Sequence, residues 1–443
     1  MISASQSAQI LANLGITALN PMQEAAQNAI RQPNDTFLIA PTGSGKTVAF
    51  LLPVLELLNA DRVGTVQCLI LAPSRELAMQ IEQVWKKMAT GYKVNVCYGG
   101  HSVETEINNL SNPPALLIGT PGRICDHIER RSVALDGVHT LVLDEFDKSL
   151  TLGFHDEMAF IVRNLPNLRK RVLVSATSDV SVPDFVRLHA PVTLTFTTDE
   201  SESANLTTKV VYSPEKDKID TLFNLLCSLN SEAALIFLNH REAAERTSEL
   251  LNERGIFSTV YHGGLEQADR ERALIQFRNG SVTYLVTTDL AARGLDIPEM
   301  KHVVHYHLPQ KEHEFTHRNG RTARMHMSGT AYVILHRDEP RPDFLPEPMD
   351  ELVLPTDDQL VLPKPPEFVT LYVSGGRKNK LNKVDIVGFF SQKGQLDKGD
   401  LGRIEVQDFM SFAAVKRGKV EALLAKISDE KMKGKKYKVE IAR

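Results

Sequence analysis

Short apolar runs separated by amphipathic stretches dominate the first three quarters of this chain. Between residues 37 and 200, the runs with the length of buried strands are 37–40, 68–72, 94–98, 115–119, 140–143 and 171–175. After a polar, acidic stretch near 199–204, they resume at 234–238, 258–261, 284–287, 302–306 and 329–335. Strands of this kind with helices between them predict a parallel sheet covered on both faces. The pattern therefore predicts two α/β domains in tandem, residues 1–200 and 201–337.

The rest of the chain follows two other patterns. Residues 338–366 hold eight of the 22 prolines and many acids, which predicts an extended linker that cannot continue a sheet. In residues 367–443, strands are expected at 368–373, 403–406, 411–415 and 437–441, and helices at 383–390 and 420–427. This β-α-β-β-α-β order is typical of a small α+β domain of the split βαβ, or RRM-like, type.

Charge is unevenly distributed along the 443 residues, although the net charge is only −4. Residues 364–443 hold 18 Lys and Arg against 10 Asp and Glu, whereas the rest holds 33 against 45. A basic tail on an acidic body suggests contact with nucleic acid, and the alternative is a solvated basic surface. Four widely spaced cysteines indicate reduced thiols in a cytoplasmic protein. No apolar run approaches the ~18 residues of a membrane span.

A Gly-rich turn after residues 37–40 has the strand–loop–helix order of a P-loop. Small residues allow backbone N–H groups to surround a phosphate, and the helix N-terminus adds partial positive charge. Lys46 would reach the β- and γ-phosphates, and the Thr47 hydroxyl would hold Mg²⁺. The alternative is an ordinary flexible turn. The residues expected around the phosphates are Thr42, Gly43, Ser44, Gly45, Lys46 and Thr47.

Two further clusters fit a nucleotide hydrolase. Asp144 and Glu145 end an apolar run, where Asp144 would hold Mg²⁺ and Glu145 would position and deprotonate the attacking water. Arg321 and Arg324 are three residues apart, so on a helix they would share a face. From the second domain they would neutralise transition-state charge on the γ-phosphate. The alternative for the arginines is an ordinary basic patch.

As an ordered set, these motifs resemble the DEAD-box ATP-dependent RNA helicases of superfamily 2, over roughly residues 10–337. The resemblance implies two tandem RecA-like domains with ATP and Mg²⁺ as cofactors. The residues that carry it are Gln23, 40–47, 73–77, 99–100, 120–123, 144–147, 175–177, 236–237, Gln267, Arg270, 288–289, 292–296 and 317–324. Departures from the family's pattern are Phe146 for Ala, Ser74 for Thr, Asn319 for Ile and Ala323 for Gly, with Gln6 where an aromatic residue usually precedes Gln23.

The resemblance also implies roles for single residues. Gln23 would read the adenine edge, and Asp296 would contact the ribose. The residues that would couple the ATP site to domain closure are Asp147, Ser175, Thr177 and His317. Those that would line a groove for single-stranded RNA, mainly through phosphate and sugar, are Arg75, Gly100, Thr120, Arg123, Arg270 and Thr288.

The tail resembles the RNA-binding domain of DbpA-type helicases, through residues 369–373, the 375–376 turn and the closing 433–439. Tyr372 would stack on a base, whereas Phe412 is either a second stacking residue or part of the core. Lysines that cluster beside the first and last strands favour a structured-RNA site, and ribosomal RNA is the target that the resemblance implies. They are Lys378, Lys380, Lys383, Lys433, Lys435 and Lys436.

Together, the sequence predicts a monomeric ATP-dependent RNA helicase that unwinds RNA duplexes locally or remodels RNA–protein complexes, with ribosome assembly as the expected process. One alternative is an ATP-gated RNA clamp with little unwinding. Another is a DNA translocase. The sequence does not identify the RNA.

Overall fold

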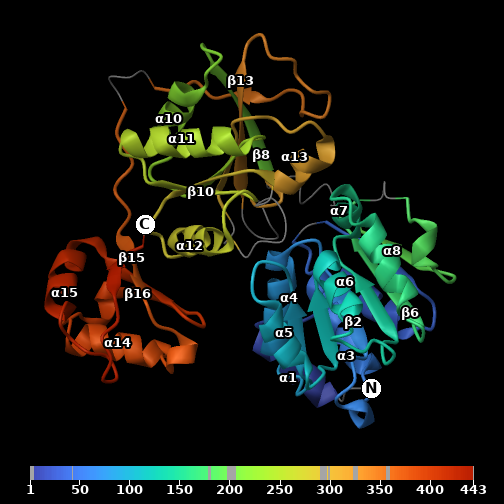
Figure 1. Cartoon of the computed structure of the whole chain (residues 1–443). Coiled ribbons are helices and arrows are strands. Elements are labelled where there is room, and N and C mark those ends of the chain that lie inside the picture. The colour runs from blue at the N-terminus through green and yellow to red at the C-terminus, as the bar shows by residue number, and fades with distance from the viewer. Residues whose placement is uncertain are drawn as a thin grey trace. The chain divides into compact units, whose positions relative to one another are not determined.

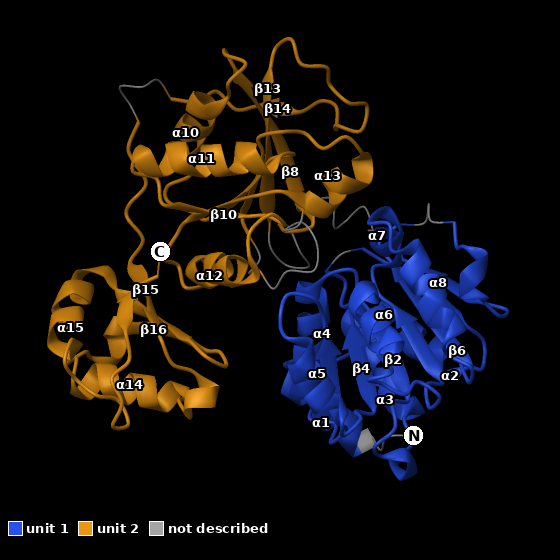
Figure 2. Cartoon of the chain, in the orientation of Figure 1, with its two compact units in different colours: residues 1–203, 294–296 blue, residues 204–293, 297–443 orange. Residues whose placement is uncertain are grey.

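The structure is a computed structural model. Its described residues are 4–41, 43–177, 181–196, 206–289, 297, 300–322, 328–355 and 360–442. The described residues up to 196 form one compact unit, and those from 206 onward, apart from the gaps, form a second (Figure 2). Each unit is described by itself below. Among the described residues, every helix is too short or too polar to cross a lipid bilayer.

A parallel seven-stranded sheet forms the centre of the first unit, with the order β3-β4-β2-β5-β6-β1-β7 among the described residues. Alternate side chains of β2 point to opposite faces of the sheet. Ile70 belongs to the hydrophobic cluster on one face, and Leu69 and Leu71 belong to the cluster on the other. Helices therefore cover both faces (Figure 1), as the apolar runs predict. The strands are β1 (Thr36–Ile39), β2 (Cys68–Leu71), β3 (Val94–Cys97), β4 (Leu116–Gly119), β5 (Thr140–Leu143), β6 (Lys170–Ser175) and β7 (Val192–Thr195).

Helices of the first unit follow the strands in alternation after two N-terminal helices. They are α1 (Ala4–Leu14), α2 (Pro21–Arg31), α3 (Lys46–Leu57), α4 (Arg75–Met88), α5 (Val103–Leu110), α6 (Pro121–Glu129), α7 (Phe146–Thr151) and α8 (His155–Arg163). The sequence did not predict β7, which pairs with β1 at the edge of the sheet. Its residues are only partly buried, so its apolar pattern is weak.

The second unit holds another parallel seven-stranded sheet, with the order β10-β11-β9-β12-β13-β8-β14 among the described residues. Its strands are β8 (Leu206–Ser213), β9 (Ala234–Phe237), β10 (Ser258–Tyr261), β11 (Tyr284–Thr287), β12 (His302–His305), β13 (Gly329–His336) and β14 (Asp350–Glu351). Its helices are α10 (Ile219–Ser228), α11 (Arg241–Glu253), α12 (Gln267–Arg278) and α13 (Glu312–Asn319).

Part of the Pro-rich segment 338–366 pairs with this second sheet, so the prediction that it cannot continue a sheet is wrong at one point. Asp350 and Glu351 form β14, which pairs with β8 at the sheet edge. An edge strand needs hydrogen bonds on one side only, which a Pro-rich segment can still supply. Leu352 and Leu354 beside it pack against the core of the unit.

Residues 367–442, here called the tail domain, have the predicted β-α-β-β-α-β order. The elements are β15 (Phe368–Val373), α14 (Lys383–Gln392), β16 (Leu401–Val406), β17 (Ser411–Lys416), α15 (Val420–Ile427) and β18 (Val439–Ile441). The sheet is antiparallel, with the order β16-β17-β15-β18. Leu371 and Val373 of β15 face the domain's own core, whereas Tyr372 on the opposite face packs with Phe412 in a separate cluster.

Candidate active site and nucleic-acid interface

Three adjacent strands of the first unit place the nucleotide motifs at one edge of the sheet. β6 lies between β5 and β1. Asp144 follows β5, Ser175 ends β6, and the P-loop follows β1. Carboxyl ends of parallel strands face the same side of a sheet, where α/β proteins bind their ligands. The motifs that are far apart in sequence therefore meet at one site.

The P-loop conformation depends on its glycines. Gly43 and Gly45 have φ of +88° and +87°, in the left-handed region. A Cβ on Gly45 would lie 2.5 Å from Gln23 Nε2, so any larger residue would push this side chain away. Lys46 Nζ donates hydrogen bonds to Ala40 O at 2.6 Å and Pro41 O at 2.7 Å. The other loop members, Ser44 and Thr47, lie beside these residues, and Thr42 falls outside the described residues.

Gln23 forms hydrogen bonds both with the cap of its own helix and with the P-loop. Asn20 caps α2 by accepting the Gln23 N–H at 2.8 Å, and Gln23 Oε1 accepts the Asn20 N–H at 3.0 Å. Gln23 Nε2 also donates to Gly45 O at 3.2 Å. A base that engages this amide would therefore act directly on the loop that surrounds the phosphates.

Asp144 is a buried acid whose charge needs a cation. It is 3% exposed, and burial, with the nearby charge of Glu145, raises its pKa to about 7. The Lys46 ammonium opposes this shift, so the P-loop lysine and Asp144 belong to one electrostatic site. Glu145 has φ of 45° and caps α7, and its N–H donates to Asp144 Oδ1 at 2.9 Å. A buried carboxylate of this kind fits a divalent cation, as the Mg²⁺ prediction requires.

The turn after β6 is tied to the P-loop. Ser175 Oγ donates to Thr177 O at 2.8 Å, and the Thr177 N–H donates back to Ser175 Oγ at 3.1 Å. The Ser175 carbonyl accepts the Ala40 N–H at 3.1 Å, which fixes the start of the P-loop. Asp147 in α7 is buried as well. Displacement of this turn would therefore move the nucleotide site.

The other half of the strand-end edge carries the predicted RNA-contact residues of the first unit. Gly100 has φ of +96°, and a Cβ there would lie 2.2 Å from Arg75 Nη1. Thr120 caps α6, and Arg123 in its first turn donates to His101 O at 2.8 Å. These residues follow β2, β3 and β4, whereas the nucleotide motifs follow β1, β5 and β6. The predicted nucleotide residues and the predicted RNA contacts thus occupy separate halves of this edge.

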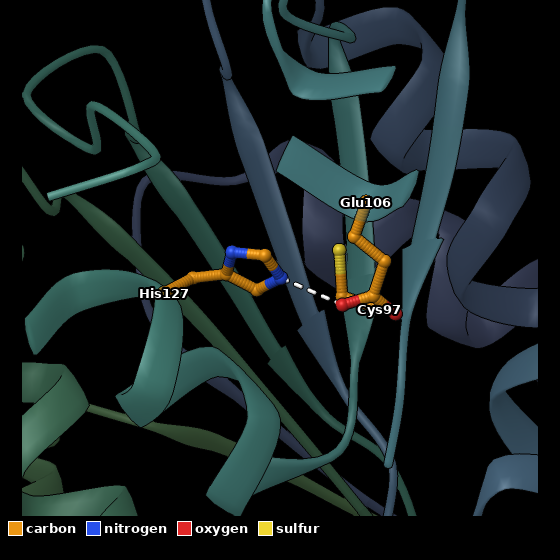
Figure 3. Close-up of side chains that lie close together, drawn as sticks. All are labelled: Cys97, Glu106 and His127. Carbon is orange, nitrogen blue, oxygen red and sulfur yellow. Dashed lines mark hydrogen bonds and ion pairs between the residues drawn. The ribbon is translucent and has the colours of Figure 1, made fainter. Parts of the chain in front are cut away.

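Glu106, which sequence reasoning missed, lies at the centre of a polar cluster in this second half (Figure 3). Its Oε1 accepts the Tyr98 N–H at 2.9 Å, and its Oε2 lies 2.7 Å from His127 Nε2 and 3.3 Å from Arg123 Nε. The ligand atoms of Cys97, Glu106 and His127 are close enough to hold a metal ion. However, burial raises the pKa of the Cys97 thiol, and Glu106 already has hydrogen-bond and ionic partners. We therefore assign the cluster a structural role, in which it orients Arg123.

In the second unit, Arg318 forms hydrogen bonds with Asp289, two residues after the end of β11. This side chain is fully buried, and it donates to Asp289 Oδ1 at 2.6 Å and Oδ2 at 3.0 Å. It also donates to His307 O at 2.7 Å and to Asn239 Oδ1 at 2.9 Å. Thr288, a predicted RNA contact, directly precedes Asp289. The arginine was part of a predicted motif, but only the structure reveals these partners.

The shared helix face expected for the two other arginines is not observed. α13 ends at Asn319, and Arg321 lies in the turn that follows, with 4% of its surface exposed. His317 lies within α13 and is also buried. Arg324 and Asp296 fall outside the described residues. The helical argument for pairing the two arginines therefore does not apply at Arg321.

Two departures from the family's pattern have packing reasons. Phe146 is fully buried among the apolar side chains on one face of the first sheet, so its larger ring extends the core. Asn319 Oδ1 lies 2.8 Å from His305 Nε2, a pair buried in the second unit. Burial, with a contribution from the Arg318 charge, lowers the pKa of His305 to about 3. Neutral His305 therefore donates to Asn319.

In the tail domain, the aromatic residues lie in a buried cluster, whereas the lysines lie at the surface. Tyr372 is partly buried against Phe412, which is 1% exposed, and their rings meet edge to face with centroids 5.8 Å apart. Lys378 and Lys380 are exposed, in and just after a short 3₁₀ helix. Arg270 lies in α12 of the adjoining sheet domain and is buried. Phe412 is therefore part of a buried cluster and is not an exposed stacking platform.

Comparison with known families accounts for most of the chain. Residues 20–185 match the DEAD/DEAH box helicase family, and residues 217–326 match the helicase conserved C-terminal domain. Residues 370–441 match the DbpA RNA binding domain. These ranges cover the nucleotide motifs of the first unit, strands β9 to β12 of the second sheet and most of the tail domain.

Individual relatives are similar over nearly the whole chain. The chain is 32% identical over 439 residues to the ATP-dependent RNA helicase DbpA of Escherichia coli, covering 97% of this chain and 96% of the relative. It is 30% identical to DbpA of Bacillus subtilis, with the same coverage of 97% and 96%. The solved structure of S. cerevisiae Dbp5 bound to RNA and ADP BeF3 is 28% identical, with a TM-score of 0.67 over 76% of this chain and 88% of that chain.

Proposed function

Because the chain belongs to the DEAD-box family of ATP-dependent RNA helicases, we propose that it couples ATP hydrolysis to local RNA unwinding or RNA–protein remodelling during ribosome assembly. Residues 1–200 would form the nucleotide-binding helicase domain and 201–337 the domain that supplies the arginines. Residues 338–366 would link these to the RNA-binding domain at 367–443. We propose a cytoplasmic monomer.

For the nucleotide, we propose that Gln23, Gly43 to Thr47 and Asp144 bind ATP and Mg²⁺. Thr47 and Asp144 would hold the metal, which when bound neutralises charge on the phosphates. Lys46 would leave the carbonyls that it now contacts and donate to phosphate oxygens. Thr42 and Asp296 would complete the nucleotide site.

Hydrolysis in this proposal depends on both helicase domains. Glu145 would orient the attacking water and accept its proton. Arg321 and Arg324 would stabilise the negative charge that develops on the γ-phosphate. The residues proposed to couple this site to domain closure are Asp147, Ser175, Thr177 and His317.

RNA would lie along the second half of the strand-end edge. Contacts of this kind go mostly to phosphates and sugars, so they select RNA by its 2′-OH more than by its sequence. A strand bent across both helicase domains cannot remain paired. The proposed core contacts are Arg75, Gly100, Thr120, Arg123, Arg270 and Thr288.

The observation that supports this proposal is the grouping at the carboxyl ends of the strands, where the predicted nucleotide residues follow β1, β5 and β6 and the predicted RNA contacts follow β2, β3 and β4. The test measures ATPase with and without single-stranded RNA, together with displacement of a short RNA duplex. We expect RNA to stimulate ATPase and ATP to drive displacement. ATPase without displacement would favour the clamp, and stimulation by DNA alone would favour the translocase.

For the tail, we propose that Lys378 and Lys380 contact a structured RNA, with ribosomal RNA as the candidate class, and that Tyr372 adds a further contact. Their exposure and positive charge support this assignment for the lysines. ATPase measured across a panel of cellular RNAs, including ribosomal fragments, tests it. Equal stimulation by every RNA in the panel would contradict it.

A further inference from the structure

Helix α12 bears a proposed RNA contact in its first turn, and it also packs against the tail domain. It begins at Gln267, and Arg270 lies in its first turn. Within the second unit, α12 contacts β15 of the tail domain (Figure 1). Ile275 of α12 forms a buried cluster with Phe412 and Ala442 of the tail domain. The tail domain is therefore docked on the helix that bears Arg270.

Polar contacts accompany this apolar docking. Thr370 Oγ1 accepts a hydrogen bond from Asn279 Nδ2 at 3.1 Å and lies 2.7 Å from Ser281 Oγ. Gln276 Nε2 donates to the Ala442 carbonyl at 2.7 Å. Thr370, Asn279 and Ser281 are all buried. Because these polar groups form hydrogen bonds across the interface, they fix the orientation of the tail domain on α12.

One set of side chains at this interface leads to Arg270. Gln407 of the tail domain donates from Nε2 to Glu271 Oε2 at 3.0 Å. Glu271 Oε1 accepts from Gln267 Nε2 at 2.8 Å. Gln267 Oε1 in turn accepts from Arg270 Nη2 at 2.7 Å. We call these four residues the α12 network.

Glu271 determines how the other members of the α12 network are oriented. An ionised carboxylate only accepts hydrogen bonds, so both neighbouring amides must turn their Nε2 groups toward it. Gln267 must then present its oxygen to the Arg270 guanidinium. The rotamer of Arg270 is thereby fixed before RNA arrives, which reduces the ordering entropy that binding would otherwise lose.

The other end of the α12 network reaches the tail lysines. The Gln407 carbonyl accepts the Arg377 N–H at 2.8 Å, and the Asp408 carbonyl accepts the Lys378 N–H at 2.8 Å. A Cβ on Gly376 would lie 2.2 Å from the Gln407 oxygen, so this close approach requires glycine. The loop that carries Gln407 is therefore fixed to the backbone that carries Lys378.

We propose that Gln407 and Glu271 are positioning residues, which hold Arg270 in its RNA-binding orientation while the tail domain is docked. The docked tail domain then raises the RNA affinity of the helicase core by direct contact, in addition to any RNA that it binds itself. This inference rests on the proposed role of Arg270 as an RNA contact.

The test uses the full chain with Gln407→Glu. This change places a second carboxylate against Glu271 and breaks the hydrogen bond without changing side-chain size. An unstructured oligouridylate is the RNA, and ATPase is measured against its concentration. We expect the half-saturating RNA concentration to rise roughly 3- to 30-fold, the range for mutations along coupled networks, with kcat changed less than twofold.

Two control variants separate positioning from loss of docking. The double variant Glu271→Gln with Gln407→Glu again pairs an amide with a carboxylate, but residue 271 is now the donor and residue 407 the acceptor. Its half-saturating RNA concentration should therefore return to within twofold of the parent. Gln276→Ala removes an interface contact that does not lead to Arg270, and it should leave half-saturation within twofold. Failure of the exchange to restore affinity, or an equal effect of Gln276→Ala, would overturn the proposal.

Arg270→Ala distinguishes failure of this inference from failure of the proposed function. If Gln407 acts through Arg270, then Gln407→Glu has no further effect on half-saturation in the Arg270→Ala background. Additive effects of the two changes would overturn the positioning role while leaving Arg270 as an RNA contact. Parent-like half-saturation in Arg270→Ala alone would overturn the proposed RNA contact itself.

Discussion

Arg318 donates two hydrogen bonds to the carboxylate of Asp289, at 2.6 Å and 3.0 Å, from a fully buried position. Its guanidinium also lies over the Phe237 ring, 5.2 Å from the ring centroid. The pair joins α13 to Asp289, which lies two residues after the end of β11. A buried cation with a carboxylate partner thus connects the predicted arginine motif at 317–324 with the residue next to Thr288, a predicted RNA contact.

We expect Asp289→Ala to lower the free energy of unfolding by about 2 kcal/mol, because it leaves a buried guanidinium without its anion. Asp220→Ala is the matched control, since Asp220 pairs with Arg254 at 2.5 Å but its side chain is 73% exposed. Removing an exposed pair should change stability by less than about 0.5 kcal/mol. Denaturant titration of both variants checks this, and equal losses would contradict the assigned role of Asp289.

Replacing Glu145 tests the proposed hydrolytic chemistry. We expect Glu145→Gln to lower RNA-stimulated ATPase at least ~100-fold, because the amide cannot accept the proton of the attacking water. Nucleotide affinity, measured with a fluorescent ATP analogue, should change less than threefold. Glu129→Gln, an exposed change at the end of α6, serves as the control with full activity. An active Glu145→Gln enzyme would remove this residue from the mechanism.

The buried His305 predicts a specific loss of stability in acid. Burial lowers its pKa to about 3, whereas an unfolded histidine titrates near 6.5. Below about pH 6.5 the unfolded state binds a proton that the folded state refuses, so stability falls as pH falls, by at most ~1.4 kcal/mol per unit for this group.

Comparing the His305→Gln variant with the parent checks this expectation. Glutamine keeps a donor for Asn319 but cannot be protonated, so the drop in unfolding free energy between pH 7 and pH 5 should shrink. His240→Gln, at an exposed position, should leave the drop unchanged. An identical pH dependence in the parent and His305→Gln would show that another group causes the acid sensitivity.

The structural role assigned to Cys97, Glu106 and His127 predicts that a chelator will not change the thermal stability of the nucleotide-free protein. Glu106 is already paired with the Tyr98 N–H and with His127, and the thiol is protonated, so removing metal should leave the Tm unchanged within about 1 °C. Thermal melting with and without EDTA, together with metal analysis of the purified chain, measures this. Stoichiometric zinc and a lower Tm with EDTA would instead identify a metal site.

The tail lysines predict a change in RNA choice. We expect Lys378→Glu with Lys380→Glu to weaken binding of a structured ribosomal fragment about 10-fold or more and to reduce its salt dependence, because two phosphate contacts are lost. ATPase saturated with an oligouridylate should stay within twofold. Lys398→Glu makes the same type of charge change, half as large in total, at another exposed tail position and should bind normally. Unchanged binding in the double variant would move the RNA site elsewhere.

Much of the fold follows from local pattern. The apolar runs at 68–72, 140–143 and 171–175 correspond to β2, β5 and β6 within one residue at each end. The strands β7, β8 and β14 were missed. Exposed residues alternate with partly buried ones in β7, both residues of β14 are exposed, and β8 has polar residues at 207–209, so none of the three has a continuous apolar pattern.

By itself, the sequence determined the order of most of the elements, the P-loop with its glycines, and the acids that follow β5. Each of these depends on residues that are close together in the chain, whose turn geometry and periodicity are visible locally. Only the tertiary structure decided that Gln407 meets Glu271, 136 residues away, and that Arg318 meets Asp289. Such contacts depend on how whole surfaces pack. The sequence around one residue does not reveal which distant residue will pack against it.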